Sequence, residues 1–327
     1  MTINHRRWAW VVLALTFFVG VGCGANTSEP RSAAEAQGVV IAQQEVQTPA
    51  PPEPKDAAQA ARKVVEARIG AMLRVDRLRG HPAGERLVRL GQIDAIFEGT
   101  DVDLLRDATL AFVASTGVTR DDTAVLVVQH RIEPEALRKA VEAVMARSEP
   151  QGQWLTSTKV QTARIRVRGH EQLLALCEND ILVVLPPHLE NQVNTFAGPL
   201  KLSSWDGPEA MIADVDEPST SLRAKNAPKI PPTINNVELT LTLRPDGGLE
   251  VQGDGQSTDA EQAKLDAKAL TRAVAKATSV KVSIVRVRFF KKVPFRAEGD
   301  QVKSKIRMSA EEVSRLLSMA EALTGGR

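Results

Sequence analysis

Apolar residues recur along this chain at two spacings, which predict a mixture of strands and helices. Short, continuous apolar runs at 109–114, 124–128 and 181–185 are typical of strands that are covered on both faces. Strict alternation at 164–168 and 237–243 predicts strands with one face buried and the other in water. A Pro-Asp-Gly-Gly turn follows the second alternating strand, so we expect a hairpin with the next strand there.

Helices are predicted where apolar residues recur every three or four positions. Asp56 is suited to cap the first helix, which we expect to run to Arg79 with Val65 and Ile69 on its buried face. Pro134 suits the first turn of a second helix, because that turn leaves its amide hydrogens unbonded. Two later helices are expected to begin with capping boxes, in which Thr or Ser is followed three residues later by Glu. These pairs are Thr258 with Glu261 and Ser309 with Glu312.

The order of the elements is similar in the two halves of the body, which suggests a weak internal duplication. A proline-rich link at 228–232 separates the halves. We therefore predict an α+β fold of two similar lobes, at 56–226 and 227–327. Each lobe is expected to be an antiparallel sheet with helices packed on one face. This arrangement resembles uncharacterised exported proteins built from repeated sheet-and-helix units, and the likeness implies no activity.

The first residues have the pattern of an export signal. Arg6 and Arg7 precede an apolar run at 8–21, which is shorter than the roughly 20 residues that a membrane-spanning helix needs. The run ends in Gly-Val-Gly-Cys, and this cysteine, Cys23, resembles the lipobox cysteine of bacterial lipoproteins. The resemblance implies that residues 1–22 are a signal peptide. It also implies that Cys23 becomes the first mature residue and carries lipid on its sulfur and its amino group.

Two expectations follow for the start of the mature protein. Residues 23–55 are rich in Ala, Gln, Glu, Ser and Pro and contain no aromatic residue, so we expect a disordered tether behind the lipidated Cys23. The residue after the cysteine is Gly24, and no aspartate is present there to indicate retention in the inner membrane. The resemblance therefore favours an outer-membrane location facing the periplasm, with the cell surface as an alternative.

Composition places the body among ordinary globular proteins. Hydrophobic residues make up 43% of the chain and charged residues 25%, and the formal net charge is +2, so no global field would recruit nucleic acid. Apart from Cys23 the chain has one cysteine, Cys177, which leaves no partner for an intramolecular disulfide once Cys23 carries lipid. The apolar neighbours of Cys177 favour a buried thiol over a reactive one.

No motif for catalysis, phosphate binding or zinc binding is present in the sequence, so no cofactor is expected. Two acidic clusters, at 101–107 and 214–217, lack the glycine-bearing spacing of a calcium loop. Capping and turn formation explain them better, and we expect no metal site. An active site assembled in space from His130, His170 and Asp214 is a hypothesis that the sequence alone leaves open.

The candidate binding residues are basic. Arginines alternate along the predicted strand at 164–168, and a second basic group lies at 286–296. If the lobes are related, the two groups could form one surface for an anionic partner, such as a phosphorylated lipid headgroup or a cell-wall polymer. The simpler alternative is the solvent-facing side of two sheets. The candidate anion-binding residues are Arg164, Arg166, Arg168, Arg286, Arg288, Lys291 and Lys292.

Together these features predict a lipid-anchored protein of the cell envelope that acts as a non-catalytic binding or scaffolding module. Its expected partners are the membrane, reached through the lipid anchor, and an envelope protein or an anionic polymer or lipid; nucleic acid is not among them. Two alternatives stay open at this point. One is a carrier or sensor that holds an amphiphile between the lobes, and the other is an enzyme without a recognisable motif.

Overall fold

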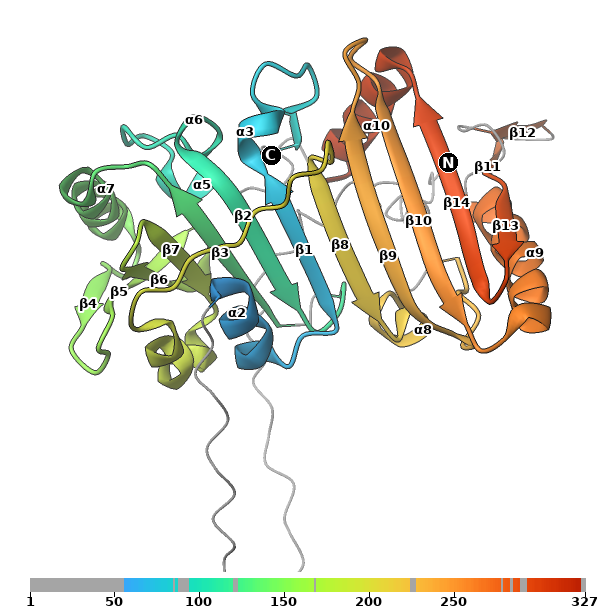
Figure 1. Cartoon of the computed structure of the whole chain (residues 1–327). Coiled ribbons are helices and arrows are strands. Elements are labelled where there is room, and N and C mark those ends of the chain that lie inside the picture. Colours follow the sequence, from blue (N-terminus) through green and yellow to red (C-terminus); the bar gives the residue numbers. More distant parts are fainter. Residues whose placement is uncertain are drawn as a thin grey trace, which may run out of the picture.

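The structure is a computed structural model that describes residues 56–84, 86–87, 94–119, 123–167, 169–223, 228–277, 279–282, 285–288 and 293–324. The predicted signal peptide, Cys23 and the tether lie outside the described residues, as do Arg168, Lys291 and Lys292. The described chain is a mixed α+β body with a large antiparallel sheet and several helices (Figure 1). The helices are α2 (Ala57–Val65), α3 (Val75–Leu78), α5 (Asp94–Phe97), α6 (Leu104–Asp107), α7 (Pro134–Arg147), the 3₁₀ helix η2 (Pro187–Phe196), α8 (Pro218–Ser221), α9 (Ala260–Ala277) and α10 (Ala310–Thr324).

The large sheet has 12 strands in the order β13-β14-β10-β9-β8-β1-β2-β3-β7-β6-β5-β4. Neighbouring strands are antiparallel, and most are also neighbours in sequence. Strands β11 and β12 form a small sheet of their own. The strands are β1 (Ile69–Arg74), β2 (Ala108–Ser115), β3 (Ala124–His130), β4 (Gln153–Leu155), β5 (Gln161–Val167), β6 (His170–Cys177), β7 (Ile181–Leu185), β8 (Met211–Asp216), β9 (Ile234–Leu243), β10 (Leu249–Ser257), β11 (Ser279–Val282), β12 (Val285–Arg288), β13 (Phe295–Glu298) and β14 (Gln301–Met308).

The apolar runs and the hairpin predicted from the sequence are confirmed as β2, β3, β7 and the pair β9–β10. Both faces of the first three strands are buried, because alternate residues enter two different cores. In β2, for example, Val113 packs into one core and Phe112 into the other. This double burial explains why these strands are continuous apolar runs rather than alternating ones.

Helices cover the two faces of the sheet unequally. On one face, α2 and η2 pack over β2, β3, β6 and β7, with Val65, Val193 and Phe196 in the core. On the opposite face, α7 and α10 contribute Val141, Val144, Leu316 and other residues to the second core. The expectation that helices lie on one face only is therefore wrong for this part of the chain. The double-sided apolar runs required a second layer to cover them.

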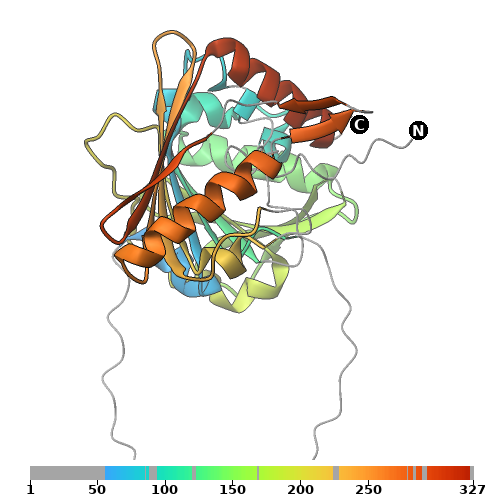
Figure 2. The same cartoon turned by 90° about the vertical axis from the view of Figure 1, so that its right-hand side faces the viewer.

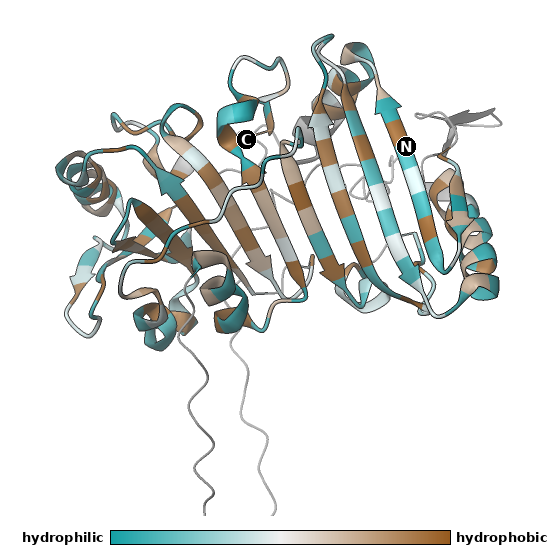
Figure 3. Cartoon of the chain, viewed as in Figure 1, coloured by the Kyte–Doolittle hydropathy of each residue, from teal (hydrophilic) through white to brown (hydrophobic). Residues whose placement is uncertain are grey.

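The part of the sheet formed by β8, β9, β10 and β14 has one polar face. Val302 and Met308 on β14 point to the same side of that strand and pack with α9 and α10, respectively. Figure 2 shows these two helices, coloured orange and red, beside the sheet. The residues between them are half-buried or exposed, and all but Ile306 are polar or charged. Figure 3 shows the resulting alternation of hydrophilic and hydrophobic positions along β9, β10 and β14. This is the pattern of strands with one face in water.

The first predicted helix is only partly correct. Asp56 caps α2 as expected, its Oδ1 accepting the backbone N–H of Ala58 at 2.7 Å. The helix then ends at Val65, and Glu66 adopts a left-handed backbone conformation (φ 50°). The residues that follow form β1, which pairs with β2 on one side and β8 on the other. Apolar residues at 69 and 72 continue the helical spacing of Val65, but pairing on both sides makes them part of a strand.

Helix starts were predicted with more success near the C-terminus. Ser309 Oγ accepts the N–H of Glu312 at 3.3 Å, and Glu312 Oε2 accepts the N–H of Ser309 at 2.9 Å, which is the predicted capping box. At α9 the capping side chain is Asp259 in place of Thr258, since Asp259 Oδ1 accepts the N–H of Gln262 at 2.8 Å. An aspartate is a good acceptor at this position, so the start of α9 moves by one residue.

The predicted boundary between the lobes does not interrupt the sheet. β8 belongs to the predicted N-terminal lobe and β9 to the C-terminal one, yet they pair from Met211 with Leu241 to Asp216 with Asn236. Strands from both predicted lobes are therefore parts of one continuous sheet. The alternation of elements that suggested two lobes gave no information on which strands pair across the link.

Candidate anion-binding end of the sheet

Charge is distributed very unevenly along the chain. Residues 260–308 contain thirteen Lys and Arg and four Asp and Glu, a formal net charge of +9, whereas the whole chain carries +2 and the remainder therefore −7. The same stretch builds α9 and β11 to β14, which lie together at one end of the large sheet (Figure 1). A small net charge thus conceals a strongly basic end, which attracts anions locally.

Helix α9 carries a row of like charges. Lys264, Lys268 and Arg272 follow at intervals of four residues, which places them on one face of the helix. Lys264 Nζ bonds to Glu261 Oε1 at 2.6 Å. Lys268 and Arg272 form no ion pair with any acidic group of the described residues. Like charges at this spacing destabilise a helix by about 0.2–0.5 kcal/mol per pair, which an anion bound between them would relieve.

A groove of about 560 Å³ lies between α9 and the edge strand β13. Its cationic lining consists of Lys264, Lys268, Arg272 and Arg296. The rest of its lining is small or apolar and comprises Ala267, Thr271, Ala275, Phe295 and Ala297. The groove therefore combines apolar walls with a concentration of positive charge.

Two hydrogen bonds hold the groove together. Thr271 Oγ1 donates to the backbone oxygen of Ala267 at 2.8 Å within α9, and it accepts the backbone N–H of Phe295 at 3.2 Å. Ala267 and Phe295 also belong to a small apolar cluster that includes Val302 of β14. Because β13 is fixed to the helix through Thr271, the walls of the groove are parts of one packed unit.

Three other cations of this end form ion pairs with two carboxylates. Lys305 and Arg307, on the polar face of β14, bond to the two carboxylate oxygens of Glu250, each at 2.6 Å. The hydrogen bonds from Lys305, and then those from Arg307 and Gln252, lower the pKa of Glu250 to about 2, although burial opposes them. Lys303 pairs with Glu298 at 3.1 Å. Each of these three cations thus has a carboxylate partner, whereas Lys268 and Arg272 in the groove have none among the described residues.

The two basic groups predicted from the sequence are not brought together. Arg164 lies on β5, next to one edge of the sheet, where it pairs with Glu171 at 3.3 Å and with Glu190. Arg166 is exposed on the same strand. Arg286 and Arg288 belong to β12, whose partner β11 packs near α9 at the other end. One shared surface therefore does not form, and Arg164 has two carboxylates of its own.

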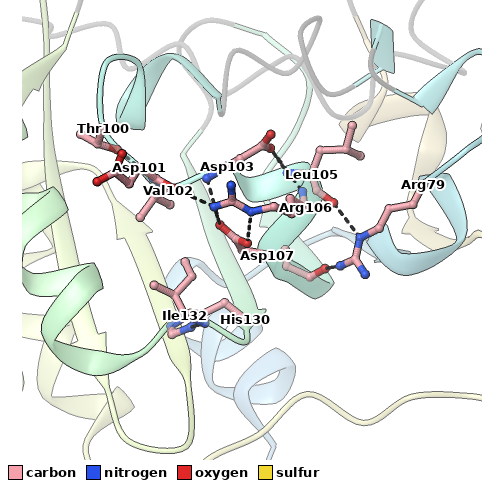
Figure 4. Close-up of polar contacts among 11 residues, drawn as sticks. Arg79, Thr100, Asp101, Val102, Asp103, Leu105, Arg106, Asp107, His130 and Ile132 are labelled. Carbon is pink, nitrogen blue, oxygen red and sulfur yellow. Dashed lines mark hydrogen bonds and ion pairs between the residues drawn. The ribbon is translucent and has the colours of Figure 1, made fainter.

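The acidic cluster at 101–107 has the capping role that the sequence favoured (Figure 4). Asp103 Oδ1 accepts the backbone N–H groups of Leu105 and Arg106 at 2.9 and 3.2 Å, as the N-cap of α6. Arg106 bonds to Asp107 at 2.6 Å, and this contact lowers the pKa of Asp107. Arg79 Nε donates to the backbone oxygen of Leu105 at 2.9 Å. A second cavity, of about 530 Å³, lies beside these groups, whose hydrogen-bonding capacity is largely used within the protein.

The residues of the hypothetical active site do not converge. His130 ends β3 beside the first residue of β7, Ile181, which pairs with Cys177 at the end of β6. His170 is the first residue of β6 and so lies at the opposite end of that strand. Asp214 lies on β8, separated from β3 by β1 and β2. Within the described residues, no group of three or more potential ligands is close enough to hold a metal ion.

Comparison with known proteins identifies no family. No known family matches the sequence, and no curated protein matches it. Among solved structures, the chain is similar to TP0453 in crystal form I, with 12% sequence identity, coverage of 80% of this chain and 97% of that chain, and a TM-score of 0.44. No described helix is both long enough and apolar enough to cross a membrane.

Cys177 has the unreactive surroundings that its neighbours in sequence suggested. It lies half-buried at the end of β6 and packs against the core under α2 and η2. Burial, and next the charge of Glu178, raise the pKa of its thiol to about 12. The thiolate is the nucleophilic form of cysteine, so this side chain is a poor nucleophile near neutral pH.

The groove was not predicted from the sequence, although part of its signal is visible there. Lys264, Lys268 and Arg272 stand at helical spacing in a helix that the capping pattern predicted. What the sequence could not show is that the edge strand carrying Phe295 and Arg296 lies opposite this row. Arg296 was recognised as part of a basic group, but its partner element was not.

Proposed function

We propose that this chain is a lipid-anchored protein of the bacterial cell envelope whose body is a non-catalytic binding module. The leader that ends at Cys23 supports the anchor, and Gly24 supports an outer-membrane location facing the periplasm. The observation that carries the binding role is the separation of charge, +9 at one end of the sheet against −7 elsewhere. In this proposal the basic end binds an anionic envelope surface of phospholipid headgroups.

The proposal includes two related halves of the body. The hairpin β2–β3 is followed by α7, and the hairpin β9–β10 is followed by α9. Both helices pack on the same side of the sheet, since α7 shares a core with α10 and α10 lies on the side of α9. A repeated hairpin and helix supports a duplication, in which the second copy acquired the basic charge.

An anchored body with a basic end has a physical advantage at an anionic surface. Each Lys or Arg near such a surface contributes about 1 kcal/mol of attraction, which decreases within a Debye length of about 8 Å at physiological salt. The anchor would keep the body near the membrane, and the basic end would then orient it. The acidic remainder of the body would face away from the surface.

The anchor is tested by fractionating cells that express the wild type, Cys23→Ser or Cys177→Ser. We expect the wild type and Cys177→Ser in the membrane fraction and Cys23→Ser in the soluble periplasmic fraction. Cys177→Ser is the matched control, because it removes the other cysteine of the chain. A Cys23→Ser protein that stays in the membrane fraction would refute lipid anchoring through this residue.

The binding role is tested by sedimenting full-length Cys23→Ser protein with vesicles of neutral phosphatidylcholine, with or without anionic phosphatidylglycerol. We expect binding only to the anionic vesicles, with a loss of affinity as salt rises. Reversing the charge of Lys268, Arg272 and Arg296 to Glu should abolish it. The control reverses Lys63, Lys139 and Lys159, three exposed lysines of the acidic part, and should keep most of it. Equal losses in the two variants would contradict the proposal.

A further inference from the structure

The groove between α9 and β13 differs from a simple basic patch in having apolar walls. Lys268, Arg272 and Arg296 are exposed, whereas Phe295 is half-buried and packs with Ala297 and Val302. A free phosphate would use the cations and leave the apolar walls in water. A ligand that satisfies both parts needs an anionic head and a hydrocarbon chain.

We propose that this groove binds one molecule of a phosphate-headed, single-chain lipid. The phosphate would lie between Lys268, Arg272 and Arg296, and the acyl chain would lie along Ala275, Phe295 and the neighbouring small residues. This inference rests on the proposed function, because it assigns a ligand to the same basic end.

The head of the ligand follows from the arrangement of cations. Lys268 and Arg272 are one helical turn apart on α9, and Arg296 lines the groove from the edge strand β13, where it stands opposite Lys303 of β14. Cations from two sides can surround the oxygens of a phosphate, and the guanidinium of an arginine matches two of those oxygens at once. Arg272 and Arg296 are not held by carboxylates of the described residues, so their donors remain available for such a head.

The chain of the ligand follows from the walls of the groove. Ala267, Ala275 and Ala297 have no atoms beyond Cβ, which leaves space beside the ring of Phe295. The volume of about 560 Å³ lies within the range of small-molecule sites. Leu265, which is 58% exposed, lies three residues before Lys268 and extends the apolar surface of α9 beside the groove. Hydrocarbon in the groove would cover apolar surface that is now in water.

The experiment measures binding of oleoyl lysophosphatidic acid, below its critical micelle concentration, to full-length Cys23→Ser protein by calorimetry and native mass spectrometry. Inorganic phosphate tests the head alone, and lysophosphatidylcholine tests the chain with a neutral head. Ligand binding is then compared among three variants of this protein. These are Lys268→Gln with Arg272→Gln, Ala275→Phe, and the control Lys63→Gln with Lys139→Gln, which removes two exposed lysines that lie on α2 and α7, away from the groove.

We expect one lysophosphatidic acid per chain, and at least about tenfold weaker binding of phosphate and of lysophosphatidylcholine. The groove variants should each weaken binding of lysophosphatidic acid by about tenfold or more, and the control by less than about twofold. Ala275→Phe keeps every cation of the groove, so its effect on affinity measures the contribution of the acyl chain separately from that of the phosphate head. Undiminished binding in Ala275→Phe, or in the double glutamine variant, would overturn the inference.

Binding to vesicles distinguishes failure of this inference from failure of the proposed function. If anionic vesicles bind but lysophosphatidic acid does not, the groove inference is wrong and the basic end acts only as a charged surface. If lysophosphatidic acid binds in the groove but anionic vesicles do not, the inference holds and the proposed binding to an envelope surface is wrong.

Discussion

Arg62 of α2 reaches across the central strand β1 to form an ion pair with Asp214 of β8. Its guanidinium passes directly over Gly70 and lies 5.3 Å from the centre of the Phe112 ring on β2. A Cβ atom at Gly70 would overlap with Nη2 of Arg62. One side chain thus contacts three adjacent strands, and only a glycine at position 70 allows it to do so.

Gly70→Ala should therefore destabilise the protein by about 1–2 kcal/mol, because the new methyl group displaces Arg62 from both of its partners. In the Arg62→Met background the same substitution should cost less than about 0.5 kcal/mol, since a strand otherwise favours alanine over glycine. Urea denaturation of the four proteins in this double-mutant cycle measures the coupling. Additive effects would show that Arg62 does not constrain position 70.

Glu250 predicts an acid-dependent contribution to stability. Its pKa is lowered to about 2 by Lys305, Arg307 and Gln252, so its contribution is fully present above the ordinary pKa of about 4.5 and is lost as the pH falls toward 2. Glu250→Gln should lower the free energy of unfolding by about 1 kcal/mol near neutral pH, a value reduced from the full pKa shift because both cations are largely exposed.

The difference between wild type and Glu250→Gln should narrow when urea denaturation is repeated at successively lower pH below about 4.5. Asp254→Asn is the matched control, because Asp254 lies on the same strand and face as Glu250 but forms no ion pair with a cation of the described residues. It should show a smaller difference at neutral pH. A constant difference for Glu250→Gln across this range would contradict the assigned ion pairs.

Cys177 should resist alkylation in the folded protein. With a thiol pKa of about 12, the thiolate fraction near neutral pH is about three orders of magnitude below that of an ordinary cysteine with a pKa of about 8.5. Iodoacetamide labelling of Cys23→Ser, followed by mass spectrometry, measures the rate at this single remaining thiol. Rapid labelling in urea is the control for reagent access. Rapid labelling of the folded protein would show that the thiol is not desolvated.

His130 predicts a second pH dependence, with the opposite origin from that of Glu250. Nδ1 of His130 accepts the backbone N–H of Ile132 at 3.2 Å, and the ring is buried (Figure 4). Burial lowers the pKa of His130, although Asp180 and Asp107 oppose the shift. The unfolded state therefore binds more protons below about pH 6.5, so the wild type should lose stability as the pH falls through that region.

His130→Asn keeps an acceptor near the N–H of Ile132 and does not titrate, so its stability should decline less on acidification than that of the wild type. Denaturant titrations at about pH 7 and about pH 5 provide the comparison. His188→Asn, at an exposed position, should follow the wild-type pH dependence. If His130→Asn and the wild type declined equally, the histidine would not be the group responsible.

The sequence predicted those elements whose signals are local. The apolar runs that became β3 and β7 and the capping box of Ser309 and Glu312 depend on residues within one turn or one strand. The stretch after Val65 was assigned to a helix because its apolar spacing fits one. Its pairing with β8 depends on residues more than a hundred positions away, for which a single sequence gives no local signal.

The candidate site shows the same limit. The cations of α9 stand at a spacing that could have been recognised, whereas the apolar wall required β13 to lie opposite them. Conversely, the alternating arginines Arg164 and Arg166 were conspicuous in the sequence, but Glu190 of η2 pairs with Arg164. Charged residues in a sequence indicate which ligands a surface can attract only after the ion-pair partners of those residues within the protein are known.

The position of β1 in the middle of the sheet has a consequence for the order in which the chain can fold during synthesis. Its partner β2 follows within about forty residues, but its other partner β8 ends only at Asp216. Until the ribosome has produced that residue, one edge of β1 lacks its strand, and pairs so distant in sequence form slowly. A nascent chain whose central strand is not yet paired on both sides stays unfolded for longer. An unfolded polypeptide can still pass through a narrow channel.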